Sequence, residues 1–364
     1  MEDGEGAAGR GRRESPYSHW QHGEGIPINR GAFVPDLHSL EVAPWPRFGQ
    51  KGAFVNLADQ EHDDAYVLEI APGGSTEIQG HLFEIAIYVL SGRGATTIWQ
   101  PGSESKQTVE WQRGTVFAPP LNCRYQHFNL SGQDTARLFA VTAAPMTMNL
   151  YRDPDFAFNC PYAFDKRYKT EDDYFTRAPV RRGDAHLRDH GGDWVTNYVA
   201  DVRAMSLDSA GYRSDGGMLT RFHMSNNSMV LHIAEFPTGT YQRAHRHNVG
   251  AHLVVLDGQG YSTMWFKGRE DERSKVDWKD GTVFSPRDLE YHQHFNTGAT
   301  GTRCLAFRLG DLDIRGGQLA PGYDYMEELA GIPYDEEDPD VYTSFERECA
   351  KNGAAVTLPR PVYR

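Results

Sequence analysis

Several features that define common protein classes are missing from this sequence of 364 residues. It has only four cysteines, widely separated and without a CxxC pair, which fits reduced thiols better than a disulfide framework or a cysteine-ligated zinc site. No apolar run approaches the roughly 20 residues that a membrane span requires, and the first 25 residues lack the apolar stretch of a secretory signal. We therefore expect a cytoplasmic protein without a membrane partner.

Positive charge is also scarce. The chain has 37 Lys and Arg against 50 Asp and Glu, a formal net charge of -13. Because nucleic acids bind to basic faces, this balance argues against a nucleic-acid partner. It does not exclude a small anionic substrate, which responds to the local field of a pocket.

The chain does contain an internal duplication. The segment VEWQRGTVFAPP at 109–120 returns as VDWKDGTVFSPR at 276–287, and QHFN occurs at both 126–129 and 293–296. Each copy alternates short β-branched and aromatic runs with Gly, Pro and Asn, which is typical of β-strands joined by turns. The sequence therefore predicts an all-β protein built from two similar barrels or sandwiches.

The duplication also predicts where the domains begin and end. We expect a disordered N-terminus over 1–25, a first barrel over 26–150, a linker over 151–194, a second barrel over 195–312 and a C-terminal tail with helical stretches over 313–364.

The second copy holds a dense group of histidines, in AHRHNVGAH at 244–252 and YHQHFN at 291–296. Side chains alternate between the two faces of a strand, so His245 and His247 should point the same way. His292 can join them if its strand lies beside theirs. Three imidazoles in this arrangement can bind a metal ion and leave positions open for substrate and dioxygen.

Three further side chains are candidates for the same site. His252 could be a fourth ligand, could orient a ligand through a hydrogen bond, or could belong to the core. His294 is in phase with His292 and could orient substrate or move a proton, or could be structural. Arg243 is in phase with His245 and could bind a substrate carboxylate, or could lie exposed at the rim.

These motifs resemble those of the cupin superfamily, whose fold is a small jelly-roll barrel. The residues that match the two cupin motifs are Gly239, the HRH of 245–247, His252 in the place of an acidic residue, Gly258, Gly281, Pro286, His292 and Asn296. The resemblance covers 54–145 and 217–310. It implies an all-β bicupin, with two jelly-roll barrels and a few peripheral helices. In four-ligand cupins such as those similar to oxalate decarboxylases, a glutamate ligand stands where this chain has His252.

The first copy lacks most of this histidine set. The positions that correspond to His245, His247, His252, His292 and His294 are, in the same order, Gln79, His81, Ala86, Tyr125 and His127. We therefore predict that the first barrel is a scaffold with a degenerate metal site, with a weak second metal or ligand site as the alternative.

Among bicupins, the second copy is similar to the gentisate, salicylate and hydroxynaphthoate dioxygenases, which open aromatic rings with iron(II) held by three histidines. The resemblance implies that His245, His247 and His292 bind Fe(II), and that the protein is a dioxygenase acting on a small aromatic or enolisable oxygenated acid. One alternative is a Mn, Ni or Zn cupin that catalyses decarboxylation, isomerisation or hydrolysis. Another is a bicupin that binds a ligand without turnover. We also expect a homo-oligomer.

Overall fold

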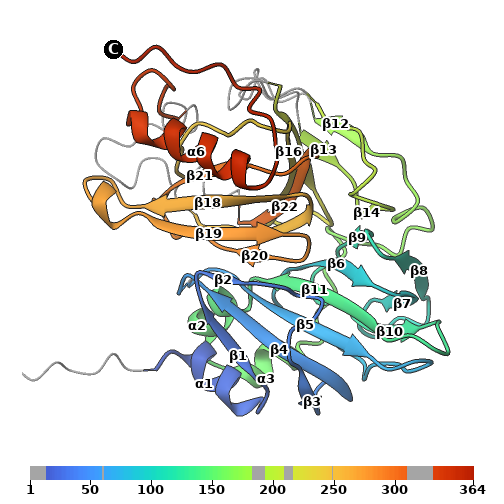
Figure 1. Ribbon diagram of the computed structural model, residues 1–364. Coiled ribbons are helices and arrows are strands. Elements are labelled where there is room, and N and C mark those ends of the chain that lie inside the picture. Colours follow the sequence, from blue (N-terminus) through green and yellow to red (C-terminus); the bar gives the residue numbers. More distant parts are fainter. Residues whose placement is uncertain (1–13, 60, 183–192, 209–215, 248, 310–330) are drawn as a thin grey trace, which may run out of the picture.

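The computed structural model describes residues 14–59, 61–182, 193–208, 216–247, 249–309 and 331–364. Most of the regular structure in these residues is β-strand, arranged in two similar groups that follow one another along the chain (Figure 1). The prediction of an all-β fold with two barrels and few helices is confirmed. None of the helices in this part of the chain is long and apolar enough to cross a membrane.

The first barrel consists of a large and a small sheet. Its strands are β1 (Ile28–Gly31), β3 (Ala43–Trp45), β4 (Gln50–Leu57), β5 (Asp64–Ile70), β6 (Ile85–Ser91), β7 (Arg93–Trp99), β8 (Gln107–Gln112), β9 (Val116–Phe117), β10 (Arg124–Asn129), β11 (Ala136–Thr142) and β14 (Tyr198–Val199). The large sheet has the order β1-β4-β5-β11-β6-β9-β14 with β3 paired to β4, and the small sheet has the order β10-β7-β8.

The second barrel repeats this plan. Its strands are β2 (Phe33–Val34), β12 (Val180–Arg182), β13 (Asp193–Val195), β15 (Met218–His223), β16 (Val230–Phe236), β17 (His252–Asp257), β18 (Gln259–Trp265), β19 (Ser274–Lys279), β20 (Val283–Phe284), β21 (Tyr291–Asn296) and β22 (Thr302–Arg308). The large sheet has the order β12-β13-β15-β16-β22-β17-β20-β2, and the small sheet has the order β19-β18-β21.

The two barrels exchange strands. β2 comes from the N-terminal segment but pairs with β20 of the second barrel, and β14 follows the expected linker but pairs with β9 of the first. The expected linker also contributes β12 to the sheet of the second barrel. The predicted boundaries at 150 and 194 therefore do not separate the barrels in space, because a strand's partner is not determined by its neighbours in sequence.

In the described residues, four α-helices lie outside the sheets: α1 (Pro16–Gly23), α2 (Ala144–Tyr151), α3 (Pro154–Asn159) and α6 (Pro339–Lys351), with one turn of 3₁₀ helix at Glu270–Glu272. α6 packs Phe345 and neighbouring apolar side chains against Tyr241 and Phe295, beside the small sheet of the second barrel (Figure 1). Residues 313–330 of the predicted tail lie outside the described residues.

α1 corrects the expectation of a disordered N-terminus for residues 14–25. The side chain of Ser15 caps the helix by accepting a hydrogen bond from the backbone N–H of Ser18, and Pro16 occupies the first turn. Tyr17 is buried and donates a hydrogen bond of 2.6 Å to Asp64 of β5. The capped, anchored helix is therefore ordered despite its Gly-rich, charged surroundings; residues 1–13 lie outside the described residues.

The large sheets of the two barrels pack face to face. Their apolar side chains form one continuous core, in which Val67 and Phe139 of the first barrel join Leu231, Leu305 and Phe307 of the second. The rings of Phe139 and Phe307 have their centroids 6.0 Å apart. Burial of apolar side chains between two packed sheets stabilises such an interface.

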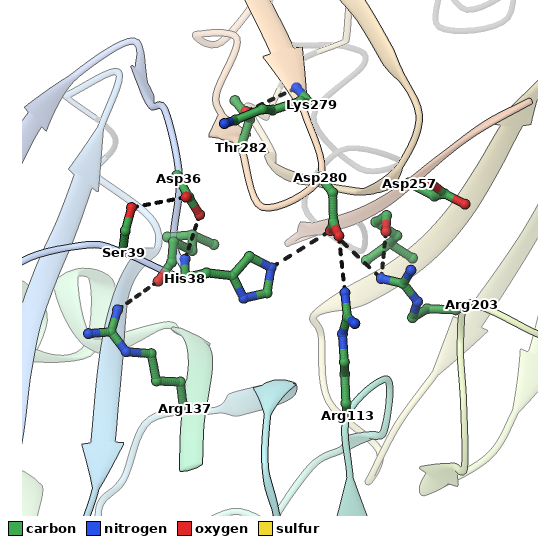
Figure 2. Close-up of polar contacts among 12 residues, drawn as sticks. Asp36, His38, Ser39, Arg113, Arg137, Arg203, Asp257, Lys279, Asp280 and Thr282 are labelled. Atoms are coloured by element: carbon green, nitrogen blue, oxygen red, sulfur yellow. Dashed lines mark hydrogen bonds and ion pairs between the residues drawn. The ribbon is translucent and has the colours of Figure 1, made fainter. Parts of the chain in front are cut away.

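A polar cluster holds the edge of the same interface (Figure 2). Asp280 of the second barrel accepts a hydrogen bond of 3.0 Å from Arg113 of the first, and its carboxylate also lies 3.7 Å from Arg203 and 3.7 Å from His38. Arg113 and Asp280 are 167 residues apart, the offset of the duplication. Equivalent turns of the two copies thus meet, as an approximate two-fold axis between the barrels requires.

Candidate metal centre

The second barrel brings three predicted histidines together. His245 and His292 form a β-bridge with reciprocal backbone hydrogen bonds of 3.1 and 2.9 Å. Their ring centroids are 4.3 Å apart, and that of His247 lies 4.9 Å from His292 and 6.3 Å from His245. All three rings are buried. We call His245, His247 and His292 the triad.

Each imidazole of the triad is oriented by a backbone carbonyl. The Nδ1 atom of His245 lies 3.1 Å from the carbonyl oxygen of Arg243, and that of His292 lies 2.9 Å from the carbonyl oxygen of Glu290. Nδ1 of His247 is bonded to the carbonyl oxygen of Val249 in the same way. A carbonyl only accepts, so each Nδ1 carries the proton and each Nε2 carries the lone pair. This is the tautomer that a metal ligand requires.

The triad lines an enclosed cavity of about 20 Å³, room for roughly one water-sized group. The other lining residues are His232, Ala234, Phe236, Gln242, Ala251, Leu253, His294, Cys304 and Ala306. Within the described part of the chain, no group of three or more His, Cys, Asp or Glu side chains is already arranged to hold a metal ion. Coordination by the triad would therefore need its side chains to adjust, and the metal site stays a proposal.

His294 lies in the cavity, and a chain of hydrogen bonds holds it there. The indole N–H of Trp278 donates to Ser262 Oγ at 2.9 Å, and this oxygen lies 2.8 Å from Nδ1 of His294. The first barrel has the same chain at the equivalent positions, formed by Trp111, Thr96 and His127. Because it also occurs where the triad is absent, the chain is part of the shared architecture, and a catalytic role for His294 stays a prediction.

His252 lies on the other side of its strand. Leu253 faces the cavity, so His252 faces the interface between the barrels, where its Nδ1 lies 3.7 Å from Oδ1 of Asp63. Both side chains are fully buried, and burial lowers the pKa of His252 to about 4. Of the three roles that the sequence left open for His252, this placement fits a core residue and contradicts a fourth metal ligand. β17 begins at His252, and His247 lies before this strand. The alternation of side chains that holds within a strand therefore does not relate the direction of His252 to that of His247.

Arg243 is also out of the expected phase. The backbone N–H groups of Gln242 and His245 bond to the carbonyls of His294 and His292, respectively. The chain therefore advances by three residues from Gln242 to His245 but by only two between their partners on β21. Such a bulge reverses the alternation. Gln242 therefore lines the cavity, whereas Arg243 lies over the ring of Tyr334, 5.3 Å from its centroid. The prediction that Arg243 shares the face of His245 is wrong.

Two lining residues were missed in the sequence. Gln242 is concealed by the bulge, for which the sequence gives no clear signal. His232 could have been found, because it alternates with Ala234 and Phe236 in VLHIAEF and shares their inward face.

In the first barrel, the side chains at the equivalent positions are bonded to one another and to the backbone. Gln79 and Tyr125 form the bridge that His245 and His292 form in the second. Nε2 of His81 accepts a hydrogen bond of 2.9 Å from the Tyr125 hydroxyl, and its Nδ1 lies 2.8 Å from the carbonyl oxygen of Phe83. Burial lowers the pKa of His81 to about 3, which keeps the ring neutral. The one histidine left in this ligand set is engaged by a tyrosine.

Two barrels of this topology in one chain, each with a large and a small sheet, define the bicupin fold. Among solved structures, the chain is similar to a two-residue deletion mutant and to a tryptophan-to-phenylalanine variant of Bacillus subtilis oxalate decarboxylase, each with a TM-score of 0.50, 12% identity and 76% of both chains covered. Vicilin from Corylus avellana gives a TM-score of 0.47 at 10% identity, covering 75% of this chain and 84% of vicilin. No family model matches the chain, and no curated protein matches it. At such identities the likeness concerns the fold alone.

Proposed function

We propose that the protein is a metal-dependent enzyme whose divalent ion is held by the triad in the second barrel. The observation that carries the proposal is the set of three Nδ1 contacts to backbone carbonyls, at Arg243, Val249 and Glu290. These contacts favour the tautomer that leaves Nε2 available to a metal, and hydrogen bonds of this kind commonly support metal-bound histidines.

The charge of the proposed centre indicates its substrates. Three neutral imidazoles leave a divalent ion with most of its positive charge, so the ion favours anionic oxygen ligands. Catecholates, ortho-hydroxycarboxylates and enolised diketones carry two such oxygens at chelating distance. Gln242 and His294 line the same cavity and can hydrogen-bond to a substrate beside the ion.

An iron(II) dioxygenase is the reaction class that we favour. The inward position nearest the start of β17 is Ala251, whose methyl group cannot bind a metal, so this strand adds no carboxylate ligand to the triad. This fits the three-histidine sites of the ring-opening dioxygenases that the sequence resembles better than a four-ligand site with a glutamate. Iron(II) bound there would supply the activation of dioxygen.

The second candidate is a manganese, nickel or zinc enzyme that decarboxylates, isomerises or hydrolyses its substrate without consuming oxygen. It shares every feature of the triad, and its support is the fold-level likeness to oxalate decarboxylase. A bicupin that binds metal or ligand without turnover is the third.

Oxygen uptake separates these candidates. Metal-free protein is loaded anaerobically with Fe(II) or with Mn(II) and given gentisate, salicylate, 1-hydroxy-2-naphthoate, catechol, acetylacetone or oxalate under an oxygen electrode. We expect stoichiometric oxygen uptake and a cleaved product with iron only. Carbon dioxide release without net oxygen uptake would establish the second candidate, and metal binding without turnover on any substrate would favour the third.

A further inference from the structure

The inner face of the second barrel carries two buried arginines. Arg221 of β15 pairs directly with His232, which lines the cavity, and directly paired residues share one face of a sheet. Arg308 follows Cys304 and Ala306, two lining residues of β22, in the same alternation. Arg221 is 3% exposed and Arg308 is 2% exposed. Both guanidinium stems thus begin on the face that the triad occupies.

Among the described residues, Arg221 has no acidic partner. Its Nη2 atom is buried and has no hydrogen-bond partner, and no acidic side chain of the described residues forms an ion pair with it. Arg303, on the outer face of β22, shows the contrast, because its Nε lies 2.6 Å from a carboxylate oxygen of Glu235. A buried guanidinium without a partner is costly, and proteins compensate buried charges with a counter-ion or a ligand.

The first barrel has no arginine at the position equivalent to Arg221. By strand register, Phe54 and Tyr66 form the pair that Arg221 and His232 form in the second barrel. The inward position of Val230 is held in the first barrel by Asp64, which accepts hydrogen bonds from Tyr17, Gln21 and Asn56. The same position is therefore an acidic residue with three hydrogen-bond donors in the first barrel and an apolar valine in the second, which offers Arg221 no carboxylate there.

We propose that Arg221 binds the carboxylate group of a small molecule that enters the second barrel, on the same inner face as the triad. The planar guanidinium fork matches a planar carboxylate, with two parallel hydrogen bonds. Arg221 is not itself a lining residue of the cavity, but its strand partner His232 is, so the proposed site adjoins the cavity on the same inner face.

This inference deepens the proposed function, because it makes the substrate of the metal centre a carboxylic acid and places the recognising residue on β15. The subsite itself consists of protein groups alone. It can therefore be tested on metal-free protein, so that a failure of the metal proposal and a failure of this one give different results.

Formate is the probe. Metal-free protein is titrated with sodium formate by calorimetry and thermal unfolding, against sodium chloride at equal ionic strength. We expect saturable binding and a rise in Tm with formate for the wild type. Arg221→Gln should bind formate at least about 10-fold more weakly, since charge-assisted hydrogen bonds are lost, and Arg221→Lys should fall between the two. Arg93→Gln, which removes an exposed arginine from the first barrel, is the matched control and should bind like the wild type.

Stability without formate separates ligand binding from a structural role. Arg221→Gln should unfold at the wild-type Tm or above it, because it removes an uncompensated buried charge. A large fall in Tm, or formate binding equal to that of the wild type, would overturn the proposal. Tighter binding of inorganic phosphate than of formate would also overturn it in favour of a tetrahedral anion. Formate binding by a protein that takes up no metal would leave the subsite standing and refute the metal centre.

Discussion

In the first barrel Gln79 is bridged to Tyr125, and in the second His245 is bridged to His292, through the same strand register and the same bulge. The hydroxyl that links a tryptophan to a histidine is likewise present in both. What differs is the chemical group at the end of these two inward side chains. It is an amide and a phenol in the first barrel, and two imidazoles that can bind a metal in the second. A duplicated framework can therefore keep its architecture while only one copy keeps a ligand set.

The largest expected effect is the gain of a second metal site. The double substitution Gln79→His with Tyr125→His would give the first barrel an imidazole at each position of the triad, together with His81. The orienting acceptor is in place, because Gln79 already donates to the carbonyl of Glu77 as His245 does to that of Arg243. We expect the metal content to rise from one to two ions per chain by elemental analysis.

The single variant Gln79→His is the control for this graft, and it should stay at one ion because its barrel would hold only two of the three imidazoles. A folded double variant that still binds one ion would show that the two frameworks differ in more than their donor atoms.

The shared hydrogen-bond chain predicts equal losses of stability in the two barrels. Ser262→Ala and Thr96→Val each leave a buried indole N–H and a buried imidazole nitrogen without their partner. We expect each to lower the free energy of unfolding by about 2–3 kcal/mol, the cost of buried unsatisfied groups. Urea unfolding measures both. A loss confined to Ser262→Ala would mean that the chain is structural in the second barrel alone.

The catalytic activity of the same two variants distinguishes the barrels further. Ser262→Ala frees His294 beside the triad and should reduce activity, whereas Thr96→Val should leave activity unchanged.

The smallest expected effect concerns His252, which faces Asp63 instead of the cavity. His252→Gln should leave metal affinity within about threefold of the wild type, below the 10- to 100-fold loss typical of supporting residues at metal sites. Competition with a chelator measures this affinity, and a tenfold loss would restore His252 to the site.

The pH dependence of the free energy of unfolding tests whether His252 is buried at the interface between the barrels. The pKa of His252 is about 4 in the folded protein, below its usual value of about 6.5. The unfolded chain therefore binds a proton as the pH falls below 6.5 while the folded protein does not, and folding stability falls toward acid. Glutamine does not titrate, so between pH 7 and pH 5 the variant should lose about 2 kcal/mol less than the wild type. Equal losses would mean that His252 takes up its proton in the folded state.

Strand alternation, the repeat and the resemblance to the cupin motifs were enough to predict the two barrels, the triad and the inward place of His294. They failed where the backbone departs from a regular strand. The bulge moves Gln242 inward and Arg243 outward, and the turn before β17 turns His252 away. Arg221 was missed for another reason: its inward direction follows from pairing with β16, and the register between strands is fixed only in the folded sheet.

One metal in the second barrel is the central claim, and its most direct test is the metal content of three proteins purified without added metal and then loaded with Fe(II) or Mn(II). The account predicts one ion per chain in the wild type, none in His247→Ala and one in His81→Ala. These histidines occupy equivalent positions, but His247 lies beside another imidazole, that of His292, whereas His81 is hydrogen-bonded to the Tyr125 hydroxyl. Two ions per chain in the wild type, or loss of the ion from folded His81→Ala, would contradict it.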